Sequence, residues 1–228
     1  MPTFTHGKDA VVLLDNTNLS TTLTDVSFSL TSDVSETKAV ESELEIFWET
    51  SFETSSPDSD AEYLAQLGGS GAAFSVAPIG YTRGNPSTFG SVIETSYDRS
   101  ADIGGVVAAA VAFQFDGDAY NGKSMLDVTT LTSTATQTSV DFGAAGTNGG
   151  AATLHVTAAS GTSPTLTAKI QTSADNSSFS DYITFTQNTA VGSELKTSAS
   201  APARYARAVL TIGGSTPSFT VAISFAQG

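Results

Sequence analysis

Apolar and polar residues alternate in short runs along most of the chain, which is the pattern of half-buried β-strands. Between Asp25 and Leu30, every second residue is apolar, so we expect one face of this segment to be buried and the other to be wet. The pattern predicts strands in the first part of the chain at residues 10–14, 25–30, 44–52, 73–77, 91–97 and 105–115.

One segment has the spacing of a helix instead. Ser59 and Glu62 form a capping box, and apolar residues follow at helical spacing as far as Leu67. The pair Gly68-Gly69 then ends the pattern. We therefore expect one short helix over residues 60–67, beside the strands of the first part.

After residue 150 the alternation predicts the strands of a β-sandwich, around residues 154–158, 166–170 and 219–225. Two stretches of this part echo each other: Gly161-Thr-Ser-Pro-Thr-Leu-Thr and Gly214-Ser-Thr-Pro-Ser-Phe-Thr. We expect the same turn into a strand in both, with proline opening the strand where no ladder hydrogen bond is lost.

The charged residues divide the chain near residue 132. Residues 1–132 hold 19 Asp and Glu against five Lys and Arg, whereas residues 133–228 hold four of each, so the net charge of −14 belongs to the first part. The polar segment 129–138, TTLTSTATQT, is typical of a linker that packs into neither neighbour. We therefore expect two domains, residues 1–132 and 133–228, which separate at this linker.

The densest acidic stretch is amphipathic at the strand period. Its odd positions carry Glu41, Glu43, Glu45, Glu49 and Glu53, and its even positions carry Leu44, Ile46, Trp48 and Phe52. Five carboxylates with no interleaved Lys or Arg repel one another, which favours a functional acidic wall; an ordinary solvated face is the alternative. Because DNA binding needs cations to displace the counterions of phosphate, such a wall should repel DNA.

Nucleotide and metal motifs are incomplete. Residues 117–124 have the spacing of a phosphate-binding loop, but the residues that follow indicate a strand instead of the helix that such a loop requires. Asp116, Asp118, Asn121 and Asp127 match half of a calcium loop, whose fifth position is here Tyr120. We expect neither a cofactor nor a bound metal.

Catalytic patterns are also missing. The two histidines, His6 and His155, are far apart in sequence, and we expect both to be solvated, with His155 on the outward face of its strand. There is no G-x-S-x-G elbow, and the absence of cysteine excludes disulfides, thiolate zinc sites and cysteine nucleophiles. We expect a non-enzymatic protein, with no membrane span and no export signal.

Four segments carry a family resemblance. HGKDA at residues 6–10, LTDVSFSL, PIGYTRGN and SVIETSYDRSADIGGVVAAAVAFQFDG, with the short helix between the second and third, resemble the major tail (tail tube) proteins of siphophages. The likeness covers roughly residues 3–130 and implies a β-sandwich or barrel with one flanking helix, whose subunits form hexameric rings that stack into a tube. Residues 133–228 resemble β-sandwich domains appended to phage tubes or capsids, which suits an outer decoration.

These observations predict a structural virion protein of a phage tail, made in the host cytoplasm. We expect it to polymerise into a tube whose acidic wall lines the channel, so that DNA passes without being bound. The resemblance implies further copies of the chain, a tape-measure protein and tail-end proteins as partners. Two alternatives remain open: a capsid decoration or cement protein that forms small closed oligomers, and a host carbohydrate-binding module that uses Phe179, Tyr182 or Tyr205 as sugar platforms.

Overall fold

The computed structural model describes the backbone of residues 9–21, 23–32, 42–52, 71–101 and 107–228, and the side chains of residues 9–20, 71–96 and 111–228. The protein is all-β, as the alternating pattern predicted, and a short 3₁₀ turn, η2 (Leu19–Thr21), lies between two of the strands. The helix expected over residues 60–67 lies outside the described residues. Among the described residues, none of the helices has the length and apolar character needed to cross a membrane.

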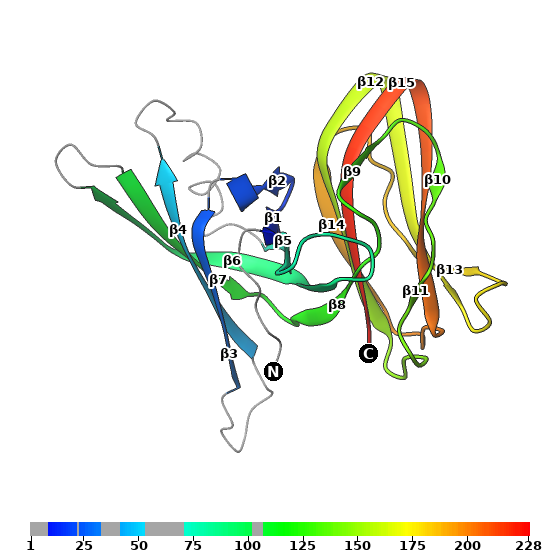
Figure 1. Cartoon of the computed structure of the whole chain (residues 1–228), viewed down its shortest axis with the longest axis horizontal. Coiled ribbons are helices and arrows are strands. Elements are labelled where there is room, and N and C mark those ends of the chain that lie inside the picture. The colour runs from blue at the N-terminus through cyan, green and yellow to red at the C-terminus, as the bar shows by residue number, and fades with distance from the viewer. Residues whose placement is uncertain (1–8, 22, 33–41, 53–70, 102–106) are drawn as a thin grey trace.

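The strands form two lobes (Figure 1). The N-terminal lobe holds β1 (Val11–Leu14), β2 (Thr17–Asn18), β3 (Leu23–Ser32), β4 (Ser42–Phe52), β5 (Ala72–Ala77), β6 (Pro86–Ala101), β7 (Val107–Phe115) and β8 (Tyr120–Ser124). The second lobe, which we call the sandwich, holds β9 (Thr129–Leu131), β10 (Ala135–Thr136), β11 (Val140–Asp141), β12 (Gly150–Ser173), β13 (Ser180–Thr184), β14 (Gly192–Ser198) and β15 (Tyr205–Gln227). All six strands expected before residue 116 are present, several of them longer than the sequence pattern indicated.

The N-terminal lobe has two layers. Strands β3, β4, β7 and the second half of β6 pair in that order, all antiparallel. The first half of β6 pairs with β5, which pairs with β1. An apolar core fills the space between these layers: Val12, Leu14, Phe74 and Val76 from β1 and β5 pack against Val92, Val111, Phe113 and Phe115 from β6 and β7.

The sandwich is built from one long ribbon folded over on itself. Strands β12 and β15 pair antiparallel along almost their whole length, from Gly150 opposite Gln227 to Ser173 opposite Tyr205. The ribbon bends in the middle, so each half contributes to a different sheet (Figure 1). Strands β14, β9 and β8 pair with one half, and β13, β10 and β11 pair with the other.

The bend of the ribbon lies at the two echoed stretches, which face each other. Gly161 and Gly214 have positive φ angles of 120° and 108°, and Ser163 and Thr216 have φ angles of 50° and 49°. A Cβ on Gly161 would lie 2.7 Å from the Thr216 carbonyl oxygen, and one on Gly214 would lie 2.6 Å from that of Ser163. The echo therefore encodes two reciprocal bends, because only glycine permits this close approach at such a backbone angle.

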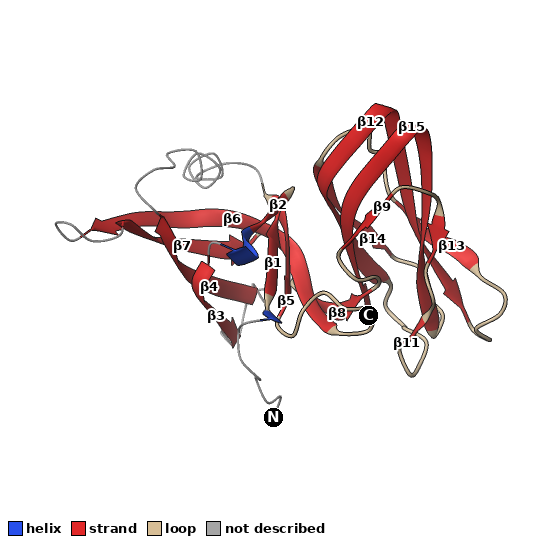
Figure 2. Ribbon diagram, turned by 45° about the horizontal axis from the view of Figure 1, so that its top comes forward, coloured by secondary structure: helices blue, strands red, loops and turns tan. Residues whose placement is uncertain are grey.

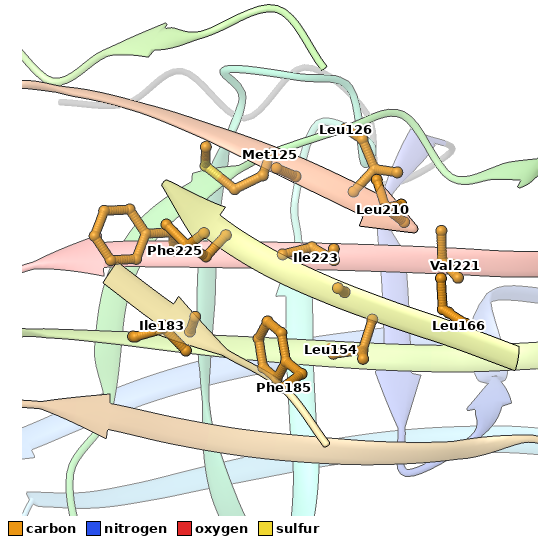
Figure 3. Close-up of a cluster of buried hydrophobic side chains, with 14 of the residues drawn as sticks. Met125, Leu126, Leu154, Leu166, Ile183, Phe185, Leu210, Val221, Ile223 and Phe225 are labelled. Carbon is orange, nitrogen blue, oxygen red and sulfur yellow. The ribbon is translucent and has the colours of Figure 1, made fainter. Parts of the chain in front are cut away.

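The core of the sandwich lies between the two halves of the ribbon. Figure 3 shows Leu154, Val221, Ile223 and Phe225 from one half converging on Leu166 and Leu210 from the other, with Ile183 and Phe185 beside them. Every one of these side chains is buried. Leu154, Leu166, Val221, Ile223 and Phe225 are residues that the period-two pattern placed on one face of their strands, whereas the structure adds Ile183, Phe185 and Leu210 to the core.

The segment expected to be an unpaired linker, residues 129–138, is part of the sandwich. Thr129 to Leu131 pair with Phe219 to Val221 of β15, and Ala135 and Thr136 pair with Leu210 and Val209. The linker expectation was therefore wrong: threonines that lack a clear alternation still form edge strands when a long neighbouring strand supplies the hydrogen bonds. The division of the chain into domains at residue 132 stays a prediction.

Candidate functional site

The acidic stretch forms a regular strand at the centre of the four-stranded sheet. Glu43, Glu45 and Glu49 lie on β4, whereas Glu41 and Glu53 fall outside the described residues. Strand β4 pairs with β7 in unbroken register from Ile46 opposite Phe113 to Phe52 opposite Val107. The period of two that the sequence indicated is therefore kept along this strand.

The register separates the two faces of this sheet. Positions 46 and 48 of β4 stand opposite Phe113 and Val111, whose side chains are fully buried in the core of the N-terminal lobe. Directly paired residues of neighbouring strands share a face, and alternate residues change face. Positions 43, 45 and 49 therefore belong to the face turned away from that core, which we call the acidic face.

Pairing brings further acidic positions to this face. Asp25 of β3 is opposite Glu49, which is opposite Ala110 of β7, which in turn is opposite Asp98 of β6. Three acidic positions thus stand in one row across four strands. Sequence reasoning placed Asp25 on a polar face but did not join it to Asp98 and Glu49, because only the strand order reveals the row.

The next row on the same face has no acidic residue. Ser27, Phe47, Ala112 and Ser96 are paired across the four strands. No Lys or Arg occupies either row. Like charges placed directly opposite one another destabilise a sheet, so the row through Glu49 is unfavourable for folding by itself.

A second notable arrangement lies at the junction between the lobes. Strands β1 and β5 are buried on both faces, because one face packs on the core of the N-terminal lobe and the other packs on β12 and β15 of the sandwich. Leu13, Ala77 and Tyr81 form a cluster with Ala222 of β15. Phe89 similarly packs with Ala151 and Ala226.

His155 lies at the centre of this junction and is fully buried. Its Nδ1 lies 2.6 Å from the carbonyl oxygen of Asp15, and its Nε2 lies 2.7 Å from Ser75 Oγ. Since a carbonyl oxygen only accepts, Nδ1 donates, and Nε2 of the neutral ring accepts from the Ser75 hydroxyl. Burial lowers the pKa of His155 to about 4, so the ring is neutral near pH 7.

Other polar groups extend the junction network. Tyr81 and Ser224 hydroxyls lie 2.6 Å apart, and Ser193 Oγ donates to the Asp15 carboxylate. Burial raises the pKa of Tyr81 to about 12. These contacts join β1, β5 and the loop after β5 to β14 and β15, so the lobes are held by paired polar groups as well as by apolar packing.

The placement of His155 corrects the sequence analysis, which expected a solvated side chain. His155 does point out of the sandwich core, as its position between Leu154 and Val156 indicated, but β1 and β5 cover that outward face. The other histidine, His6, lies outside the described residues. A Ser–His pair at 2.7 Å has the reach of a nucleophile and base. Here Ser75 and His155 are both fully buried, which leaves no access for a substrate.

The successive layers place the acidic face and the sandwich at opposite ends of the protein. From one end to the other, the order is the sheet of β3, β4, β7 and β6, then β1 and β5, then the two sheets of the sandwich (Figure 2). The face of the first sheet that is turned toward β1 and β5 is the apolar one. The acidic face is therefore turned away from the sandwich.

The charges of the sandwich are satisfied internally. All four of its cations have a partner: Lys169 with Asp181, Lys196 with Glu194, Arg204 with Asp141, and Arg207 with Gln171. The remaining acid, Asp175, accepts from the backbone N–H groups of Ser177 and Ser178. These partners lower the pKa of Asp141 and of Asp175 to about 2. Residues 133–228 therefore present no cluster of unpaired cations to a nucleic acid.

The three aromatic residues considered as sugar platforms are engaged within the chain. The Arg207 guanidinium lies 3.9 Å from the centre of the Phe179 ring, and that of Arg204 lies 5.0 Å from the Tyr205 ring. Tyr182 packs edge-on against Phe225 and donates from its hydroxyl to the Ser200 carbonyl. Each of the three rings is only partly exposed.

Neither the phosphate-loop spacing of residues 117–124 nor the partial calcium loop forms a ligand site. Residues 120–124 of the phosphate-loop spacing form β8, which pairs antiparallel with β6 and β15 and is not followed by a helix within the described residues. Of the calcium-loop residues, Asp127 accepts from the backbone N–H of Arg83. Within the described part of the chain, no three His, Cys, Asp or Glu side chains are grouped so as to hold a metal.

Comparisons with known proteins found little. No protein-family model matches the chain, and no curated protein sequence matches it. Among solved structures, the chain was matched to the Dit protein of phage SPP1, described as a paradigm of the hub adsorption apparatus in phages that infect Gram-positive bacteria. The match covers 95% of this chain and 98% of that chain, with 10% sequence identity and a TM-score of 0.34. A TM-score of this size does not establish a shared fold, so the match carries no argument about function.

Proposed function

We propose that this protein is a structural subunit of a phage tail, and specifically the major tail tube subunit, which polymerises into stacked hexameric rings. The observation that carries the proposal is the layer order of the molecule. An acidic face lies at one end, with no Lys or Arg in its two described rows, and a sandwich whose charged side chains each have a partner within the lobe lies at the other. In a tube wall the acidic end would face the channel and the sandwich would face the exterior.

In this arrangement the acidic face lines the channel. Rows of carboxylates around each ring repel the phosphates of passing DNA, so no bound state retains the duplex. Glu43, Glu45 and Glu49 supply this wall together with Asp25 and Asp98, and Glu41 and Glu53 extend the same sequence pattern. The unfavourable row of like charges is then explained by the function of the tube.

Ring closure uses the edge of the same sheet. Within the described residues, β3 pairs with β4 alone, so its second edge is available to a neighbouring copy. Pairing edge strands across subunits satisfies backbone groups and joins the sheets around the ring. In the tube, a tape-measure protein and tail-end proteins are the further partners, and the protein has no catalytic role.

Electron microscopy of the purified chain tests this proposal. We expect negatively stained samples to show tubes of stacked rings, each with a central channel. Small closed oligomers would contradict the tube and favour the capsid decoration protein. A protein that stays monomeric even in concentrated solution would contradict both the tube subunit and the capsid decoration protein.

A further inference from the structure

A polar pocket of about 320 Å³ lies at the junction, apart from the acidic face. The turn that contains Asp118 and strand β8 line one side of the pocket. The ends of β12, β14 and β15 line the other side. Because the two lobes are joined by the buried network around His155, both walls are held in place.

The pocket gathers polar groups that have few partners within the protein. The side chains of Asn148 and Thr197 make no hydrogen bond within the described part of the chain, and Asp118 accepts only one long bond, at 3.4 Å, from the Tyr120 hydroxyl. Asn121 accepts from Thr88 through Oδ1, and its amide nitrogen donates to no described residue. The pocket side chains thus have unused hydrogen-bonding capacity, whereas the charged side chains of the sandwich have partners within the protein.

We propose that this pocket binds a single ring of a neutral sugar. Sugar hydroxyls both donate and accept, so a carboxylate that accepts and amides that can do both form a matching set. Asp118 would accept from two neighbouring hydroxyls, and Asn121 and Asn148 would donate to them. Tyr120, whose ring stacks on Phe89 at 5.6 Å, supplies a rigid aromatic edge to the same wall.

Size and charge restrict the ligand. At roughly 30 Å³ for each water molecule, the pocket holds about ten waters, which is room for one sugar ring and a few waters. The Asp118 carboxylate and the net charge of −14 oppose anionic ligands such as phosphorylated or carboxylated sugars. This site is distinct from Phe179, Tyr182 and Tyr205, and it does not depend on tube formation.

Titration of the whole protein with free monosaccharides tests the proposal. Glucose, galactose, mannose and N-acetylglucosamine should be added separately while backbone amide signals are followed by NMR. We expect at least one sugar to shift the signals of Asn121, Asn148 and Thr197, with a Kd on the order of 1 mM. The combined substitution of Asp118→Ala and Asn148→Ala should weaken this binding at least about tenfold.

A matched control separates the pocket from general charge effects. Asp116→Asn removes one carboxylate two residues away, on a side chain that does not line the pocket, and should leave sugar binding unchanged. The absence of any shift with all four sugars would overturn the proposal. Shifts that persist in the combined variant, or that follow calcium ions instead of sugar, would also overturn it. Amide signals at the junction that match those of the unaltered protein show that each variant is folded.

Discussion

Lowering the pH should destabilise the folded protein, because His155 is buried at the junction. His155 has a pKa of about 4 in the folded protein, against an ordinary value of 6.5. Because the folded-state pKa is lowered, the unfolded chain binds a proton more readily between these values. The free energy of unfolding should therefore fall as the pH drops from 6.5 to 4.

The size of this effect follows from the difference between the two pKa values. Each unit corresponds to about 1.4 kcal/mol, so the loss on going from pH 6.5 to pH 4 is about 3 kcal/mol. A loss of this size is a large part of the stability of an ordinary domain. Asp141 and Asp175, whose pKa values are lowered from 3.8 to about 2, lose most of their contributions below pH 4. Glu194, whose pKa is lowered from 4.5, begins to lose its contribution inside this window.

The buried carboxyl of Glu94 changes stability with pH in the opposite direction to His155. Its titration therefore has to be removed before the effect of His155 can be measured. Glu94 is buried on β6, and neither of its carboxylate oxygens has a hydrogen-bond partner among the described residues. Burial raises its pKa from 4.5 to about 7. Its folded state favours the neutral carboxyl, so stability falls as the pH rises from 4.5 to 7. Glu94→Gln keeps the shape and removes this titration.

The assay is urea unfolding of the Glu94→Gln protein between pH 4 and pH 8, with and without His155→Gln. The protein that keeps His155 should lose about 3 kcal/mol between pH 6.5 and pH 4. The double variant should start less stable at pH 7, because Gln fits the junction less well, but should lose about 3 kcal/mol less over the same range, because only the acidic groups common to both proteins still titrate. Equal pH dependence of the two proteins would refute the role assigned to the buried imidazole.

Three further predictions follow from other parts of the structure. Replacing Glu43, Glu45 and Glu49 together by Lys should leave the protein folded but make its tubes retain duplex DNA in a salt-dependent manner, with the triple Gln variant as control. If a pull-down at low salt finds no more DNA on the Lys variant than on the unaltered tubes, the acidic face is an ordinary solvated surface. Deleting residues 136–228 should expose Leu13, Tyr81 and Phe89 and cause the N-terminal lobe to aggregate or bind a hydrophobic dye. A soluble, cooperatively folding fragment would contradict this expectation and support the two separable domains that the sequence predicted. Gly161→Ala should destabilise the sandwich by about 1–3 kcal/mol in thermal unfolding because of its positive φ and the nearby Thr216 carbonyl. Gly117→Ala should cost less, because Gly117 has a similar φ but, apart from its chain neighbours, no described atom lies within 4 Å of the added Cβ.

The sequence by itself determined the strands and their faces. Alternation at a period of two identified Leu154, Val156 and Leu166 as core residues and placed Glu43, Glu45 and Glu49 on one side of β4, because a strand's side chains alternate whatever its neighbours are. The echo around Gly161 and Gly214 was also visible in the sequence, because the conformation of a sharp bend depends on the residues within it.

Only the tertiary structure decided what each outward face meets. His155 was expected in water, and residues 129–138 were expected to be unpaired, but β1 and β5 cover the first and β15 pairs with the second. The row of Asp25, Glu49 and Asp98 and the pocket around Asp118 likewise depend on which strands become neighbours. Period-two alternation fixes how residues are divided between two faces, whereas contacts between distant segments, which no local pattern encodes, determine whether a face meets water, another lobe or a ligand.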